Sequence, residues 1–183
     1  MSKPGPPLVI NCYCGQTSLE LNESGLQLGN HLVCYCESCR KFPSQVGAQG
    51  EYIDEYGGSR ILQVPPACVR ITGGQENLNS LKLTPKGPDR WFTRCCQTPL
   101  ANTSIPALPF LALIIPSDLQ QQLDSRIGAP NYHVNVEGAL KTLAPERKAS
   151  NMAAYLFKFL GQMISWRLKG LATPRPFERA QGD

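Results

Sequence analysis

Charge is scarce in this sequence. Of its 183 residues only 17% are charged, whereas glycine and proline number 16 each. This composition disfavours a helical bundle and favours many short strands joined by turns. With 42% hydrophobic residues, the chain can still build one compact domain with a core. We find no internal repeat in the tens of residues.

Long apolar runs and an export signal are missing as well. No uncharged apolar run approaches 18 residues, and the best candidate, Met152–Leu168, contains Lys158 and Arg167, so no membrane span is predicted. The apolar part of the start, MSKPGPPLVI, is too short for a signal peptide. We therefore expect a cytoplasmic protein. In that reducing compartment clustered cysteines bind metal more often than they form disulfides.

The net positive charge of the chain lies in its C-terminal part. Residues 1–140 carry 10 lysines and arginines against 11 acidic residues, while residues 141–183 carry 8 against 3. The nearly neutral first part argues against a nucleic-acid partner. The basic second part is interpreted as a solvated helix face and a loose end rather than an anion-binding surface.

The first two thirds of the chain have the pattern of a β-rich fold. Short apolar or alternating runs are separated by glycine and proline turns, which is typical of strands. The predicted strands are Leu8–Ile10, Thr17–Leu21, His31–Val33, Tyr52–Tyr56, Ile61–Val64, Val69–Thr72, Trp91–Phe92, Phe110–Ile115 and Asn131–Val136.

Two later segments have helical periodicity. Residues 118–127 follow a capping-box pattern at Ser117 and precede Gly128, which predicts a short helix. Residues 151–169 predict a C-terminal amphipathic helix that docks on the β domain or on a partner subunit, as in a homo-oligomer. Its expected apolar stripe consists of Leu156, Phe159, Leu160, Met163 and Trp166. The last stretch, Pro174–Asp183, has no periodicity and is expected to be mobile.

Seven of the eight cysteines lie in three tight clusters. The clusters are Cys12 and Cys14; Cys34, Cys36 and Cys39; and Cys95 and Cys96. A closed zinc site needs four ligands, so the first and third clusters together would staple distant segments. In an extended strand, however, Cys95 and Cys96 would point to opposite faces, which would leave one of them for packing.

The second cluster offers three sulfurs within six residues. Three protein ligands leave one zinc position open, as a catalytic site requires. Arg40 and Lys41 follow directly, would make the site electropositive and would attract an anionic substrate. The alternative is a metal-free group of thiols or a disulfide. The remaining cysteine, Cys68, is expected in the core.

The order of these motifs resembles one known family. C-x-C-G begins at Cys12, C-x-C-x-x-C-R begins at Cys34, and an aromatic-led cysteine motif, WFTRCCQT, begins at Trp91. Over residues 8–136 the chain is similar to the glutathione-dependent formaldehyde-activating enzyme and centromere protein V family. This resemblance implies a zinc-bound, mostly antiparallel β-sheet fold.

The resemblance also implies two zinc sites. The structural zinc would take Cys12, Cys14 and Cys96, but the family's fourth cysteine falls on Thr93 here and its following glycine on Gln97. Either Cys95 replaces the missing ligand, or the site is altered or empty.

A second, labile zinc would take Cys34, Cys36 and Cys39, the site that the family's enzymes use to join glutathione to formaldehyde. Cys36 would then be a catalytic residue, and Arg40 and Lys41 would bind the substrate carboxylates. His133 would form a wall of the site or, equally, be a surface strand histidine, while His31 is interpreted as structural.

We therefore predict a zinc-binding β domain over residues 1–140 and a helical extension with a flexible tail over residues 141–183, α+β overall. The first functional hypothesis is a carbon–sulfur lyase that acts on adducts of an aldehyde with glutathione or another small anionic thiol. No separate general base is evident, so catalysis stays open. The alternative is a non-catalytic, zinc-stabilised binding module for a protein partner. A redox protein comes third, because the βαβ pattern that should flank a C-x-x-C motif is missing.

Overall fold

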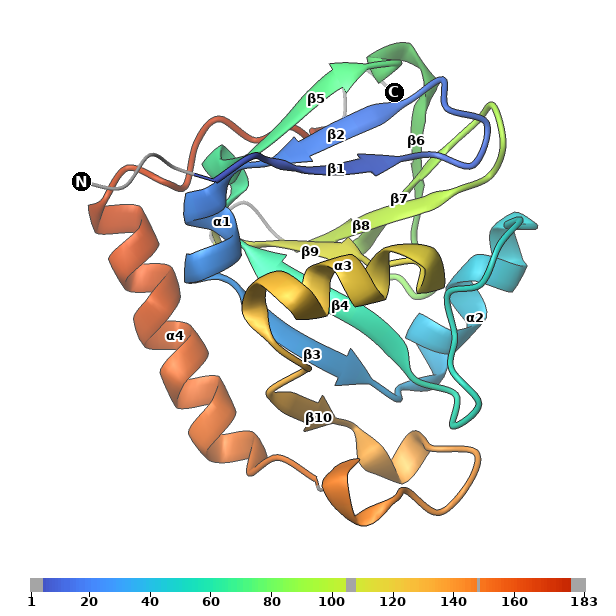
Figure 1. Ribbon diagram of the computed structural model, residues 1–183, viewed down its shortest axis with the longest axis vertical. Coiled ribbons are helices and arrows are strands. Elements are labelled where there is room, and N and C mark those ends of the chain that lie inside the picture. The colour runs from blue at the N-terminus through green and yellow to red at the C-terminus, as the bar shows by residue number, and fades with distance from the viewer. Residues whose placement is uncertain (1–4, 105–107, 148, 179–183) are drawn as a thin grey trace.

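The computed structural model in Figure 1 describes residues 5–104, 108–147 and 149–178. Strands dominate the chain as far as residue 114, and a short helix and a long C-terminal helix follow, so the predicted fold class is confirmed. The strands are β1 (Leu8–Asn11), β2 (Ser18–Leu21), β3 (Asn30–Cys34), β4 (Ser59–Val64), β5 (Val69–Gly73), β6 (Leu78–Leu81), β7 (Asp89–Thr93), β8 (Pro99–Thr103), β9 (Leu111–Ile114) and β10 (Tyr132–Val134). The α-helices are α1 (Glu23–Leu28), α2 (Glu37–Val46), α3 (Ser117–Ile127) and α4 (Met152–Leu168).

The strands form two sheets. A three-stranded sheet has the order β1-β2-β5, and a seven-stranded sheet has the order β10-β3-β4-β9-β8-β7-β6. Neighbouring strands run antiparallel, as the resemblance implies, except that β10 pairs in parallel with β3. The main core lies where the small sheet, α3 and one face of the large sheet meet, and Leu8, Leu21, Leu62, Leu113 and Leu123 are fully buried there.

Period-two alternation gives the large sheet a second buried face. On β9, Leu111 and Leu113 enter the main core, while Ala112 and Ile114 face the opposite side. Cys34 packs in the same cluster as Ala112 and Tyr155 of α4. We refer to this side of the sheet, which α2 and α4 cover, as the outer face.

Helix α4 packs on this outer face, and three residues of the predicted stripe, Phe159, Met163 and Trp166, are buried. Its buried residues are Tyr155, Phe159, Met163 and Trp166, which recur at helical spacing. The stripe was wrong at Leu156 and Leu160, which are 54% and 50% exposed. The helix is apolar on several sides, so periodicity alone could not select the face that packs. None of the helices in the described ranges is long and apolar enough to cross a membrane.

Local hydrogen bonding explains other departures from the predicted elements. Residues 52–56 form no strand apart from one bridge at Ile53, because the Asp54 carboxylate accepts the backbone N–H groups of Tyr56 and Gly58 and closes a turn. Helix α3 covers the predicted residues 118–127, but its N-cap is Pro116, which has no side-chain capping bond, and Ser117 is its first helical residue.

The basic extension folds back onto the β domain. Phe177 is buried, and its ring centroid lies 5.5 Å from that of Trp91 on β7. The sequence predicts a mobile stretch over Pro174–Asp183, whereas its first half is packed. Residues 179–183 lie outside the described residues.

Candidate metal centres

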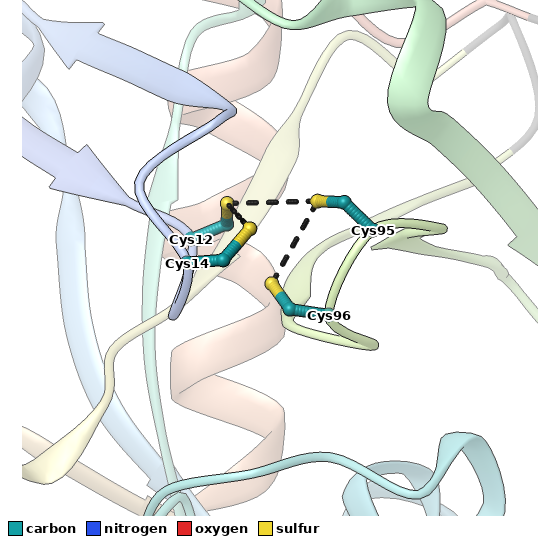
Figure 2. A group of neighbouring side chains, drawn as sticks. All are labelled: Cys12, Cys14, Cys95 and Cys96. Atoms are coloured by element: carbon teal, nitrogen blue, oxygen red, sulfur yellow. Dashed lines mark hydrogen bonds between the residues drawn. The ribbon is translucent and has the colours of Figure 1, made fainter.

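Four sulfurs from two distant hairpins converge in what we call the four-cysteine site, formed by Cys12, Cys14, Cys95 and Cys96 (Figure 2). Sγ–Sγ distances are 3.6 Å from Cys12 to Cys14, 3.8 Å from Cys12 to Cys95 and 3.7 Å from Cys95 to Cys96. A tetrahedron with metal–sulfur bonds of roughly 2.3 Å has edges of about 3.8 Å. The described sulfurs are free thiols, and their spacing fits a four-thiolate zinc site.

The β1–β2 loop presents the first pair of sulfurs. The Cys12 N–H donates to the Thr17 carbonyl, the Thr17 N–H donates to Cys12 Sγ at 3.2 Å, and Gly15 makes the reversal with φ of 74°. Across the site, the Tyr13 N–H donates to the Thr98 hydroxyl at 2.9 Å. The loop is therefore fixed both by its own backbone and by the partner hairpin.

The second pair lies in the turn between β7 and β8. Cys95 and Cys96 are turn residues rather than strand residues, so strand alternation does not apply and both sulfurs face the group. Thr93, where the resemblance expects a cysteine, is fully buried, and its hydroxyl bonds Cys96 Sγ and the Thr98 N–H. Cys95 thus stands where a fourth ligand is needed.

The backbone of this turn also explains why the resemblance expects a glycine at position 97. Gln97 has φ of 60°, the left-handed conformation that glycine adopts without strain. The position therefore has the backbone geometry of a glycine, although a glutamine occupies it here.

Two pKa shifts mark the four-cysteine site. Burial alone would raise the pKa of Cys96, but hydrogen bonds from the Thr93 and Thr98 hydroxyls and from Cys14 lower it to about 6. The pKa of Cys14 rises to about 12: a backbone hydrogen bond from Gln16 lowers it, but desolvation and the neighbouring sulfurs outweigh that bond. These contacts therefore favour the thiolate of Cys96 over that of Cys14.

A second group, the three-cysteine site, contains Cys34, Cys36 and Cys39, with all sulfurs within 4.8 Å of one another. Cys34 ends β3, Cys36 is the N-cap of α2, and Cys39 lies in the first turn of that helix. Hydrogen bonds from Cys34, and to a smaller extent from Cys39, hold the pKa of Cys36 well below its usual range. The positive end of the helix dipole acts in the same direction.

Each sulfur of the three-cysteine site has an N–H donor. Asn135 Nδ2 lies 3.2 Å from Cys34 Sγ, the Cys39 N–H donates to Cys36 Sγ at 3.4 Å, and Arg90 Nη1 lies 4.0 Å from Cys39 Sγ. Such donors are usual around metal-bound thiolates. Arg90 and Asn135 are not among the site residues predicted from the sequence. For Arg90, the one available signal was a cation directly before the predicted strand Trp91–Phe92.

The basic pair has other partners. Arg40 Nη1 donates to the carbonyls of Gly138 at 2.7 Å and Tyr35 at 3.5 Å. Lys41 is exposed and lies 2.6 Å from Glu37, one turn earlier on α2. Neither cation is among the described donors to the three sulfurs, and their predicted role in substrate binding stays a prediction.

His133 lies on the opposite side of the sheet from the three-cysteine site. On β10, Val134 packs with Cys34, while the His133 ring points the other way and its Nδ1 lies 3.0 Å from the Tyr35 hydroxyl. Arg147 bonds the same hydroxyl. Burial lowers the pKa of His133. Its predicted contact with substrate at the three-cysteine site also stays a prediction.

The two residues expected to be structural are buried. Cys68 is part of the main core. His31 Nδ1 bonds the Gly128 carbonyl at 3.0 Å, and burial lowers the pKa of the imidazole.

Comparisons with known proteins give a family but no activity. No curated protein matches the chain. The crystal structure of a Rhodobacter sphaeroides protein, a Northeast Structural Genomics target, is similar with 19% identity and a TM-score of 0.41, over 58% of this chain and 83% of that one. The pattern of one family, described as a family of unknown function (DUF6151), matches residues 1–180. The chain belongs to the DUF6151 family.

Proposed function

We propose that this protein binds two zinc ions, one structural and one able to accept a small thiol. The observation that carries the proposal is the gathering of seven cysteine sulfurs into one group of four and one group of three. Four thiolates satisfy zinc completely, whereas three leave a position for a ligand from solution. The structural ion would take the four-cysteine site and the labile ion the three-cysteine site.

The surroundings of the three-cysteine site support thiol chemistry. Apolar and aromatic side chains surround the sulfurs, including Leu32, Val134 and Tyr155, and such surroundings limit water at a reacting sulfur. A bound zinc ion would keep a substrate thiol deprotonated and nucleophilic at neutral pH. Cys36, at the N-terminus of α2, would hold the ion and contact the reacting atoms.

On this basis the favoured activity is that of a carbon–sulfur lyase acting on adducts of small thiols, such as glutathione, with formaldehyde or another aldehyde. Its specific support is the resemblance of the cysteine motifs to the glutathione-dependent formaldehyde-activating family. Arg40 already donates to a backbone carbonyl, so the carboxylates of the substrate would bind other cations. Lys41 could serve if its ion pair with Glu37 opened.

Cobalt substitution tests the proposal. Cobalt in the three-cysteine site should change its visible absorption when glutathione is added, and Cys36→Ser should abolish the change. Cys68→Ser is the matched control, because it removes a buried thiol outside both sites. A protein that binds a single metal ion, or a cobalt spectrum that no thiol perturbs, would overturn the thiol-binding role.

One observation favours a second function, that of a binding module. The side of α4 that faces away from the sheet is apolar and exposed, with Phe157 and Leu168 each 83% exposed. Exposed apolar patches of this kind mark association surfaces. The occupant we favour is a second copy of the chain, which makes the module a homo-oligomer stabilised by the structural zinc.

A further inference from the structure

Arg90 is a buried cation with no carboxylate partner among the described residues. It is 2% exposed, on β7 beneath α2. None of the ion pairs between described residues includes it. A guanidinium stays protonated in proteins, and a buried charge without a counter-charge is strongly destabilising. The fold must therefore supply negative charge close to this side chain.

Neutral groups fix the orientation of the guanidinium. Nη2 donates to the Ser38 hydroxyl at 2.7 Å, and Nη1 donates to the side-chain oxygen Oδ1 of Asn102 at 3.1 Å. The head also lies over the Phe42 ring, 5.4 Å from its centroid. Asn102 is the direct cross-strand neighbour of Arg90, and Ser38 lies between Cys36 and Cys39. These contacts hold the guanidinium against the first turn of α2 without neutralising it.

The sulfurs supply the missing charge. Nη1 lies 4.0 Å from Cys39 Sγ, while Nε has no hydrogen-bond partner among the described residues. Three thiolates around a divalent ion carry one net negative charge, and one guanidinium balances it. We propose that Arg90 is the counter-ion of the metal in the three-cysteine site and sets that site's affinity for a divalent cation. This inference rests on the second zinc site proposed above.

Metal affinity of charge variants tests the inference. Arg90→Met removes the charge and keeps much of the length, Arg90→Lys keeps the charge, and Arg70→Met is the control, a surface arginine paired with Glu20. Zinc transfer to a metallochromic chelator gives the affinity of each metal equivalent. Arg90→Met should weaken the more labile equivalent by roughly 10–100-fold, the usual effect of losing an outer-shell partner. Arg90→Lys should weaken it less, and Arg70→Met not at all.

The outcomes separate this inference from the proposed function. If the unmodified protein binds only one metal ion, the second zinc site is absent and both proposals fail. If it binds two and folded Arg90→Met holds both as tightly, the site stands and the counter-ion role is overturned. If Arg90→Met does not fold, Asn102→Ala removes the side-chain oxygen that orients Nη1 and keeps the charge of Arg90. It should weaken the labile equivalent by roughly 3–10-fold, and an unchanged affinity would refute the role of Arg90.

Discussion

Cutting the four-cysteine staple should destabilise the whole fold. The site joins the loop of the small sheet to a turn of the large sheet, and Cys12 and Cys95 are 83 residues apart. A cross-link closing a loop of that length restricts the unfolded chain by about 4.5 kcal/mol at 25 °C. The double variant Cys12→Ser/Cys14→Ser severs the link, because it leaves no sulfur on the β1–β2 side.

The expected loss is a large fraction of the total stability, since domains are stable by only about 5–15 kcal/mol. For a chain of this size it corresponds to a fall in Tm of roughly 10–15 °C. Urea unfolding and metal analysis should show this loss together with one fewer zinc equivalent. Arg94→Ser, an exposed change in the same β7–β8 turn, is the control and should leave both unchanged. A double variant that kept its zinc and its unfolding midpoint would show that the four sulfurs only pack together.

Three further outcomes are expected. Burial lowers the pKa of His31 from 6.5, so below about pH 6.5 the unfolded chain binds more protons than the folded one. The free energy of unfolding should therefore fall on acidification below about pH 6.5, by up to about 1.4 kcal/mol per pH unit. His31→Gln should flatten this part of the curve, and identical pH profiles would refute the assignment. Gln97→Gly should stabilise the protein by about 1 kcal/mol, since it relieves the left-handed backbone, and a destabilised variant in urea unfolding would contradict this. Phe157→Asp combined with Leu168→Asp should convert a dimer into a monomer in light scattering, whereas an unmodified protein that is already monomeric would exclude the α4 interface.

The β-rich part of the fold was largely predictable, because its strands carry local signals. Most predicted strands lie within two residues of the observed ones, as with Val69–Thr72 and β5. Strands β6 and β8 and helices α1 and α2 were missed. Helix α2 follows its N-cap Cys36 and contains Pro43, so its residues resemble a metal-binding turn followed by a loop more than a helix.

The cysteine groups were predictable in composition, since clustered thiols are specific sequence signals. What the sequence could not decide was whether Cys95 or Cys96 points away. That depends on the backbone of the β7–β8 turn, where Gln97 takes a conformation that its residue type disfavours. The role of Arg90 was not predictable for a related reason. It depends on the lack of a carboxylate near the guanidinium among the described residues, and only the packed structure reveals the surroundings of a side chain.

Strand β7 connects the two candidate metal sites, so we expect their properties to be interdependent. Strand β7 carries Arg90 near its start, and the turn holding Cys95 and Cys96 follows its end. The four-cysteine site fixes that turn to the small sheet, while Arg90 reaches from the same strand to Ser38 of α2. If the turn loosens, β7 can shift. The Arg90 guanidinium lies 4.0 Å from Cys39 Sγ, and a larger separation would weaken the attraction between these two groups. The zinc that remains in Cys12→Ser/Cys14→Ser should therefore pass to a chelator faster than the labile zinc of the unmodified protein. Equal rates would mean that the rest of the sheet holds Arg90 in place on its own.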